Sequence, residues 1–191
     1  KPFGRDVEMH DSSFGWRFVN KKLEALYGSD GMGTTAENLA EMYKISRADQ
    51  DIFALNSQLK AAEAQDAGRF DLETVAVEIP QRKKEPIVFS KDEFIKANST
   101  LAVLGKLRTA FKQDGSVTAG NASGLNDGAA AMLLASEEAL IKYNLKPIAK
   151  IVSSAVVGVA PRIMGIGPVK ASEKALKKAG LTLDDMDVIE L

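Results

Sequence analysis

The chain has 191 residues, 45% of them hydrophobic, and its 25 Lys and Arg nearly balance its 26 Asp and Glu. This is the composition of a globular protein, and it offers no charge excess for binding nucleic acid or an anionic membrane. The sequence contains no cysteine, which excludes disulfides, thiolate metal ligands and a cysteine nucleophile within these residues.

Two helices are predicted in the first third of the chain. Thr34 and Glu37 have the spacing of a capping box, and apolar residues then recur at helical spacing. A second helix is predicted to begin at Ser46, with Asp49 in the matching capping position, and to end at Gly68.

A strand pair is predicted next. The segment TVAVEI alternates in the manner of a strand, PIVF is a second short strand, and QRKKEP between them has the composition of a polar turn. We interpret the basic run 82–84 as an exposed loop, because a nucleic-acid site requires a larger basic surface.

In the remainder of the chain, apolar runs alternate with short helices. GAAAMLLAS (128–136), IAKIVSSAVVGV (148–159) and MDVIEL (186–191) are predicted as buried strands. Ser136 is predicted to cap one helix, and residues 172–180 to form another. The alternation favours an α/β fold with helices layered on a sheet. Because the sequence stops on an apolar strand, we expect the chain to be truncated.

The stretch SVTAGNASGLNDGAA, which begins at Ser116, contains a glycine-rich bend. It is not a phosphate-binding loop of the GxGxxG or GKS type. Two interpretations remain open from the residues alone. In one, Gly120 and Gly124 supply positive φ angles, and Asn121 and Ser123 bond to the local backbone. In the other, the same polar groups form a contact surface for amide or thioester groups of a small ligand.

The other candidate motifs have simpler interpretations. GIGPV (165–169) is typical of a turn that opens a helix, and His10 is interpreted as a surface residue. Asp184, Asp185 and Asp187 lack the spacing of a calcium loop, so we interpret them as a turn and expect no metal site. No apolar run approaches the ~20 residues of a membrane helix, and the first ten residues are not typical of a signal peptide. We therefore expect a cytoplasmic protein.

Several segments resemble, in order, successive parts of the thiolase family, which comprises acetyl-CoA acetyltransferases and 3-ketoacyl-CoA thiolases. They are MGTTAENLAE, SRADQDIFALNSQLKAAEAQDAGRF, KLRTAFKQDGSVTAGNASGLNDGAAAMLLAS, IVSSAVVGV, RIMGIGPVKAS and AGLTLDDMDVIEL. The resemblance covers essentially the whole chain, and GNASGLNDGAA is its most specific motif. FGWRFVN (14–20) further resembles the 3-oxoadipyl-CoA thiolase type.

The resemblance implies a layered α/β/α/β/α fold with a long inserted loop domain. It assigns residues 1–120 to that loop domain, 121–147 to the end of the first core half and 148–191 to the start of the second. It also implies a homo-oligomeric parent protein, a dimer or tetramer, whose loop domain makes contacts between subunits.

Thiolases condense acyl-CoA thioesters or cleave 3-ketoacyl-CoA, and the resemblance implies the same reaction for a full-length parent. The family uses two cysteines, a histidine and an asparagine-held water, and none of these four residues matches a position here. We therefore expect the chain to be inactive by itself. Two alternatives are a non-catalytic module that binds acyl-CoA or lipid, and a piece that serves subunit interaction.

The resemblance also transfers ligand contacts to this chain. Positions that match coenzyme A contacts are Leu23, Met32, Lys96, Phe111, Ala119 and Ser123, and those of the acyl-pocket loop are Met164, Gly165, Gly167 and Pro168. Ser123 matches a serine that bonds the pantetheine. Lys96 stands where many members have arginine, and Gly31 where many have histidine. Coenzyme A or acyl-CoA is expected as a substrate, with no cofactor or metal.

Overall fold

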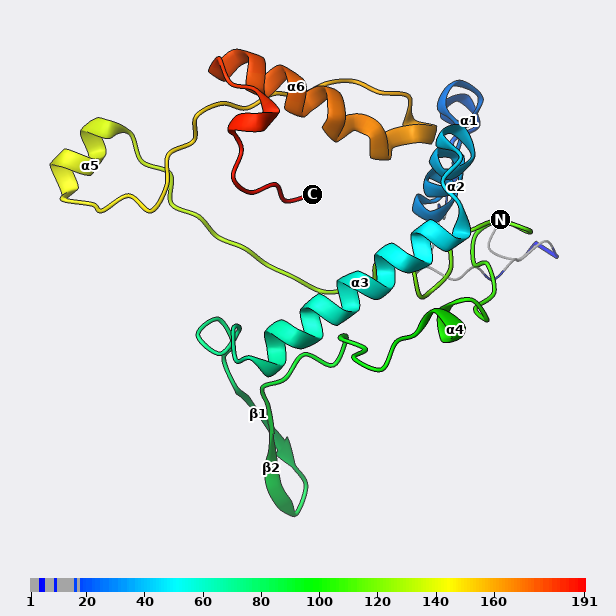
Figure 1. The fold of residues 1–191 in the computed structure, drawn as a ribbon, viewed down its shortest axis with the longest axis horizontal. Coiled ribbons are helices and arrows are strands. Elements are labelled where there is room, and N and C mark those ends of the chain that lie inside the picture. Colours follow the sequence, from blue (N-terminus) through cyan, green and yellow to red (C-terminus); the bar gives the residue numbers. More distant parts are fainter. Residues whose placement is uncertain (1–3, 6–8, 10–15, 17) are drawn as a thin grey trace. The chain divides into compact units, whose positions relative to one another are not determined.

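The computed structural model describes residues 4, 5, 9, 16 and 18–191 (Figure 1). His10 and part of FGWRFVN lie outside the described residues. Two compact units are present. Ala40–Ser123 form one unit, which we call the central unit, and the residues up to Leu39 together with Gly124–Leu191 form the other, which we call the outer unit.

The central unit is built on one long helix, α3 (Arg47–Asp66). Ser46 caps its N-terminus, since the serine side chain accepts a hydrogen bond from Asp49 N. Gly68 follows the helix with a φ of 70°, a conformation that glycine adopts without strain. The predicted start and end of this helix are therefore confirmed.

Helix α2 (Met32–Tyr43) begins earlier than the capping-box spacing predicts. Its first hydrogen bond runs from Thr35 N to Gly31 O at 3.1 Å, so Thr34 lies inside the first turn and does not precede it. The Thr35 hydroxyl donates to Met32 O at 2.7 Å within that turn. The predicted capping role of Thr34 is wrong for this reason.

A two-stranded antiparallel hairpin follows α3, formed by β1 (Val77–Gln81) and β2 (Lys84–Phe89). Arg82 and Lys83 make the turn, and Lys83 has a φ of 65°. Val77 pairs with Phe89 and Ile79 with Ile87, so apolar side chains share one face of the hairpin. The predicted strand pair is confirmed, although β1 begins three residues later than TVAVEI and both strands reach two residues further toward the turn than their apolar patterns. Of the basic run 82–84, the first two residues form the turn and Lys84 begins β2.

The remaining helices are short except for α6. They are α1 (Lys21–Tyr27), α4 (Leu101–Leu104), α5 (Glu137–Tyr143), the 3₁₀ helix η1 (Pro161–Ile166), α6 (Gly167–Ala179) and the 3₁₀ helix η2 (Leu183–Asp185). Ser136 caps α5 as predicted. Helix α6 begins five residues before Ser172, because Pro168 occupies its first turn. Asp185 caps η2 by accepting from Thr182 N at 2.7 Å, which agrees with the predicted turn.

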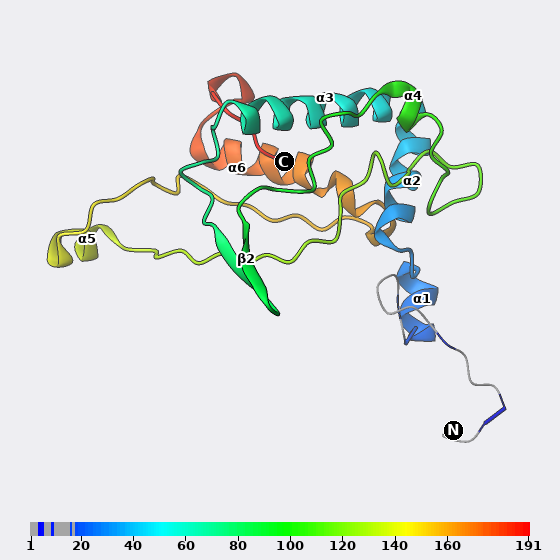
Figure 2. The same ribbon diagram turned by 90° about the horizontal axis from the view of Figure 1, so that it is seen from below.

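The three apolar segments predicted as strands, 128–136, 148–159 and 186–191, form no strand in the described chain (Figure 2). A strand requires a hydrogen-bonded neighbour, and none of the described segments pairs with these residues. Residues 152–160 still alternate between exposed and half-buried positions with a strand-like period of two. They contact α6 through Ser153 Oγ, which donates to Ala175 O at 2.7 Å.

Burial is concentrated in the central unit. The buried hydrophobic side chains among the described residues are Ala40, Ala62, Leu104 and Val117, whereas more than forty large apolar residues remain exposed. No helix within the described ranges is long and apolar enough to cross a membrane. The apolar runs that the sequence suggests as core therefore stay largely uncovered within this chain.

Candidate functional site

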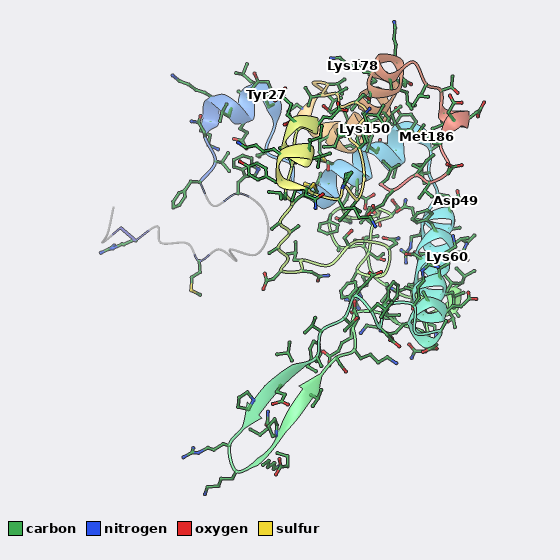
Figure 3. The ribbon with its side chains drawn as sticks, turned by 90° about the vertical axis from the view of Figure 1, so that its left-hand side faces the viewer. Tyr27, Asp49, Lys60, Lys150, Lys178 and Met186 are labelled. Carbon is green, nitrogen blue, oxygen red and sulfur yellow. The ribbon has the colours of Figure 1, made fainter. Side chains whose placement is uncertain are left out.

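Three polar side chains in the N-terminal part of α3, Arg47, Gln50 and Asp51, hold the glycine-rich bend and the segment around Leu104. Arg47 Nη2 donates to Leu104 O at 2.6 Å and to Leu107 O at 3.3 Å. Gln50 Nε2 donates to Ser116 Oγ at 2.8 Å. In Figure 3, Asp49 marks this part of the helix, and Lys60 lies further along it. The start of one helix therefore fixes two segments that follow the hairpin in sequence.

Asp51 is a buried carboxylate, with 5% of its surface exposed. Its Oδ2 accepts from Arg47 Nε at 2.8 Å, and its Oδ1 accepts from Asn121 Nδ2 at 3.0 Å. Removing a carboxylate from water is unfavourable unless its oxygens are paired, and here each oxygen has a donor. The pair therefore ties the bend to α3 at a site shielded from solvent.

Asn121 closes the bend on itself. Its Oδ1 accepts from Thr118 N at 2.7 Å, and its Nδ2 also donates to Ser116 O at 3.1 Å. Thr118 is fully buried, and its hydroxyl accepts from Gly120 N at 3.2 Å. The predicted local bonding of Asn121 is confirmed, and the same amide additionally joins the bend to Asp51.

Gly120 is required by close packing. A Cβ at this position would lie 2.5 Å from Leu107 Cδ1 and 2.6 Å from Leu104 Cδ2, distances that real Cβ atoms essentially never show. The glycines with positive φ in the described chain are Gly28, Gly68 and Gly180. The predicted positive φ of Gly120 and Gly124 is therefore wrong, and the absence of a side chain at Gly120 instead lets the bend contact two leucines.

Four of the residues expected to contact coenzyme A lie in the central unit: Lys96, Phe111, Ala119 and Ser123. All four are exposed. Lys96 is anchored by two hydrogen bonds, since its backbone N donates to Gln58 Oε1 at 2.7 Å and its Nζ to Glu93 O at 2.8 Å. No hydrogen bond in the described part of the chain links these four side chains to one another. The arrangement provides exposed polar and apolar contacts for a ligand.

In the outer unit, an ion pair joins the start of α2 to η1. Arg162 Nε donates to Asp30 Oδ2 at 2.8 Å, and the same oxygen accepts from Asn38 Nδ2 at 3.0 Å. Asn38 Nδ2 also donates to Arg162 O at 2.9 Å. The Arg162 side chain passes close to Gly28, where a Cβ would lie 3.3 Å from its Cδ. These contacts fix the segment that leads into the expected acyl-pocket loop.

The expected acyl-pocket residues Met164, Gly165, Gly167 and Pro168 occupy η1 and the first turn of α6. Met164 is exposed, and a Cβ on Gly165 would lie 2.9 Å from Leu39 Cδ1 on α2. The other two expected contacts, Leu23 on α1 and Met32 at the start of α2, are also exposed. The loop therefore packs directly against α2 through its first glycine.

The Asp30–Arg162 ion pair also shifts the pKa of both side chains. The pKa of Asp30 is lowered below its ordinary value of 3.8, first by the hydrogen bond from Arg162 and then by the hydrogen bond from Asn38. The pKa of Arg162 is raised by the same carboxylate. Both groups are therefore charged at neutral pH.

Five residues that organise these two sites could not be identified as site residues from the sequence: Asp30, Asn38, Arg47, Asp51 and Arg162. The Arg47–Asp51 pair has an i, i+4 helical spacing that was visible in the sequence. The other links join residues 70 and 132 positions apart, as for Asp51–Asn121 and Asp30–Arg162. No local signal marks such pairs, because they arise only from tertiary structure.

Two family models match the chain. "Thiolase, N-terminal domain" matches residues 6–138, and "Thiolase, C-terminal domain" matches residues 145–191. The chain is 57% identical over 189 residues to a beta-ketoadipyl-CoA thiolase of Acinetobacter baylyi, covering 99% of this chain and 47% of that protein. It is 52% identical over 192 residues to a probable acetyl-CoA acyltransferase of Staphylococcus epidermidis, covering 96% and 49%. The chain thus spans about half the length of these relatives.

Solved structures show the same likeness. Acetyl-CoA acetyltransferase of Bacillus anthracis has a TM-score of 0.78 and 42% identity, over 97% of this chain and 46% of that one. Human mitochondrial 3-ketoacyl-CoA thiolase in complex with CoA has a TM-score of 0.75 and 49% identity, over 84% and 39%. The predicted α/β fold class is confirmed by these neighbours.

Proposed function

The chain belongs to the thiolase family, and on that premise we propose that it is the coenzyme A-binding portion of an acyl-CoA C-acyltransferase. The parent enzyme cleaves or forms 3-ketoacyl-CoA. The observation that supports this best is the bend 116–123, which α3 holds through buried polar contacts while Ser123 stays exposed. A neighbour at 49% identity was solved with CoA, which supports the same ligand here.

The catalytic groups of this enzyme come from residues outside these 191. The family reaction uses two cysteines, and this sequence has none. The relatives are about twice as long as the chain, so they contain further sequence that can supply these groups. The many exposed apolar side chains agree with this view, because a layered core needs additional elements to cover them.

The proposed ligand contacts divide by chemistry. Ser123 bonds the pantetheine through its hydroxyl, and Ala119 and Phe111 provide apolar contact. Lys96 offers one positive charge to the phosphates of coenzyme A, without the paired donors of an arginine. Leu23 and Met32 complete the coenzyme A contacts, while Met164 and Pro168 shape the acyl pocket.

The organisation of the parent follows the family pattern in this proposal. Residues 1–120 belong to the loop domain, 121–147 end the first core half and 148–191 begin the second. The parent is a cytoplasmic homo-oligomer that acts in fatty acid or related acyl-CoA metabolism. Relatives named beta-ketoadipyl-CoA thiolase favour 3-oxoadipyl-CoA as its substrate.

The test is a Ser123→Ala substitution in the full-length polypeptide that carries this chain. Loss of one hydrogen bond, at about 1 kcal/mol, should raise the KM for CoA in thiolysis of 3-oxoadipyl-CoA about five-fold. Ser57→Ala, at an exposed position of α3, is the matched control and should leave the KM unchanged. An unchanged KM in Ser123→Ala would refute the proposed role of the bend.

One observation favours a second candidate, a non-catalytic module that binds acyl-CoA or lipid: the sequence contains no cysteine. Thiolysis by the full-length polypeptide decides between the two. Turnover of 3-oxoadipyl-CoA or acetoacetyl-CoA supports the enzyme, whereas CoA binding without turnover supports the module. Turnover by the purified 191-residue chain would contradict both, because neither proposal gives this chain a nucleophile.

A further inference from the structure

Asp51 is the most buried titratable group of α3, and the proposed function assigns it no contact with the ligand. Its carboxylate lies between Arg47 on its own helix and Asn121 in the bend. The Arg47 side chain is 26% exposed and that of Asp51 only 6%, so the pair is largely shielded from water. Such a pair differs from an ion pair on the surface, because removing one partner leaves the other charge buried and uncompensated.

The chemistry of a carboxylate determines which way the Asn121 amide faces. An ionised aspartate only accepts hydrogen bonds, so the NH₂ group of Asn121 must point toward it. The amide oxygen is then directed at Thr118 N, which it contacts at 2.7 Å. Together with Ser116 O, which accepts from the same NH₂ group at 3.1 Å, Asp51 favours one of the two orientations of the amide, and with it the hydrogen bond that closes the bend.

Arg47 completes this arrangement from the other side. Its Nε holds the second carboxylate oxygen, and its Nη2 donates to Leu104 O and Leu107 O. Leu104 and Leu107 are also the two side chains against which Gly120 packs. The bend is therefore fixed at Asn121 by the carboxylate and at Gly120 by leucines that the same arginine anchors.

From this geometry we infer that Asp51 is a positioning residue for coenzyme A, acting through Asn121 on the bend that carries Ser123. This inference rests on the proposed function, since it requires Ser123 to contact the ligand. Asp51 itself is buried and accepts only from Arg47 and Asn121 among the described residues. Its effect should therefore appear in the affinity for CoA and much less in the rate of the chemical step.

The experiment measures kcat and the KM for CoA in thiolysis by the full-length polypeptide. Asp51→Asn puts an NH₂ group against a donor of Arg47 or Asn121, and should raise the KM for CoA about ten-fold, with kcat changed less than about two-fold. Asn121→Ala removes the link but keeps the Arg47–Asp51 pair, and should raise the KM similarly. Glu63→Gln, an exposed carboxylate on the same helix, is the control and should change neither value.

A conservative variant distinguishes positioning from general loss of structure. Asp51→Glu keeps a carboxylate that can accept from Asn121 Nδ2, so its KM for CoA should lie between that of the wild type and that of Asp51→Asn. If Asp51→Asn does not fold, Asn121→Ala decides the question. The inference is overturned if Ser123→Ala raises the KM but Asn121→Ala does not. If neither Ser123→Ala nor Asn121→Ala raises the KM for CoA, both the proposed function of the bend and the inference about Asp51 fail.

Discussion

At the scale of single residues, the candidate site depends on contacts that restrict the residue type at position 120 and the amide orientation of Asn121. A Cβ at Gly120 would meet the methyl groups of Leu104 and Leu107, and Asn121 has one amide orientation that satisfies Thr118 N, Asp51 and Ser116 O. Ser123 is exposed, so neither close packing nor a hydrogen bond within the described chain restricts its side chain in this way. Rigid support beneath an exposed hydroxyl is the arrangement expected when a loop must present one polar group to a ligand.

Gly120→Ala should destabilise the central unit. The added methyl group meets Leu104, which is buried and has little room to move, so overpacking should cost about 1–3 kcal/mol. The measurement is the thermal unfolding midpoint of the full-length protein. Gly31→Ala is the control, because nothing lies within 4 Å of a Cβ at that position and it lies outside the predicted strands. Equal midpoints for the two variants would show that the bend yields to the extra atom.

The Asp30–Arg162 pair predicts a pH dependence. Because the folded-state pKa of Asp30 lies below its ordinary value of 3.8, the pair stabilises the folded state above that pH. This contribution is lost as the pH falls through the lower, folded-state pKa. Asp30→Asn should therefore lower the unfolding midpoint at pH 7 and make a smaller difference near pH 3. A deficit that is equal or larger in acid would contradict this account.

What the sequence could predict at this scale depends on distance along the chain. The cap at Ser46 and the local bond of Asn121 were predictable, because each involves partners three residues apart. Gly120 was identified for the wrong reason, since a preference for positive φ is a local property whereas contact with Leu104 is not. Asp51 was not identified as a site residue, because its partner in the bend lies 70 positions away.

At the scale of elements, helices and strands differ in how far this chain determines them. Helix α3 satisfies its backbone internally and was predicted from its caps and periodicity. The hairpin also formed as predicted, because both of its strands are present in the chain. The segments 128–136, 148–159 and 186–191 have strand composition but no described neighbour to pair with. An apolar pattern in one segment predicts a strand, but the hydrogen bonds that form the strand must come from a neighbouring segment.

The proposed parent fold predicts that these segments become strands in the full-length protein. Their backbone amides should then be protected from hydrogen exchange in that protein and should exchange rapidly in the isolated 191-residue chain. The hairpin 77–89 serves as an internal reference, since its pairing lies within the chain. Rapid exchange of residues 128–136 and 148–159 in both proteins would contradict the proposed layered core.

At the scale of the whole molecule, the proposed function separates binding from chemistry along the sequence. The described residues hold a hydrogen-bonded bend, an anchored segment proposed to shape the acyl pocket and the exposed positions proposed to contact coenzyme A, while the sequence contains no cysteine. The family and fold class were predictable from the sequence because GNASGLNDGAA and the accompanying segments are specific. The geometry that supports the bend was not, since it depends on which distant residues meet.

The most direct test of the central claim is a crystal structure of the full-length protein with coenzyme A bound. The account predicts the pantetheine within hydrogen-bond distance of Ser123 Oγ, the Asp51–Asn121 bond intact behind it, and a cysteine from outside these 191 residues at the thiol end. Coenzyme A bound away from the bend 116–123, with no contact to Ser123, would contradict it.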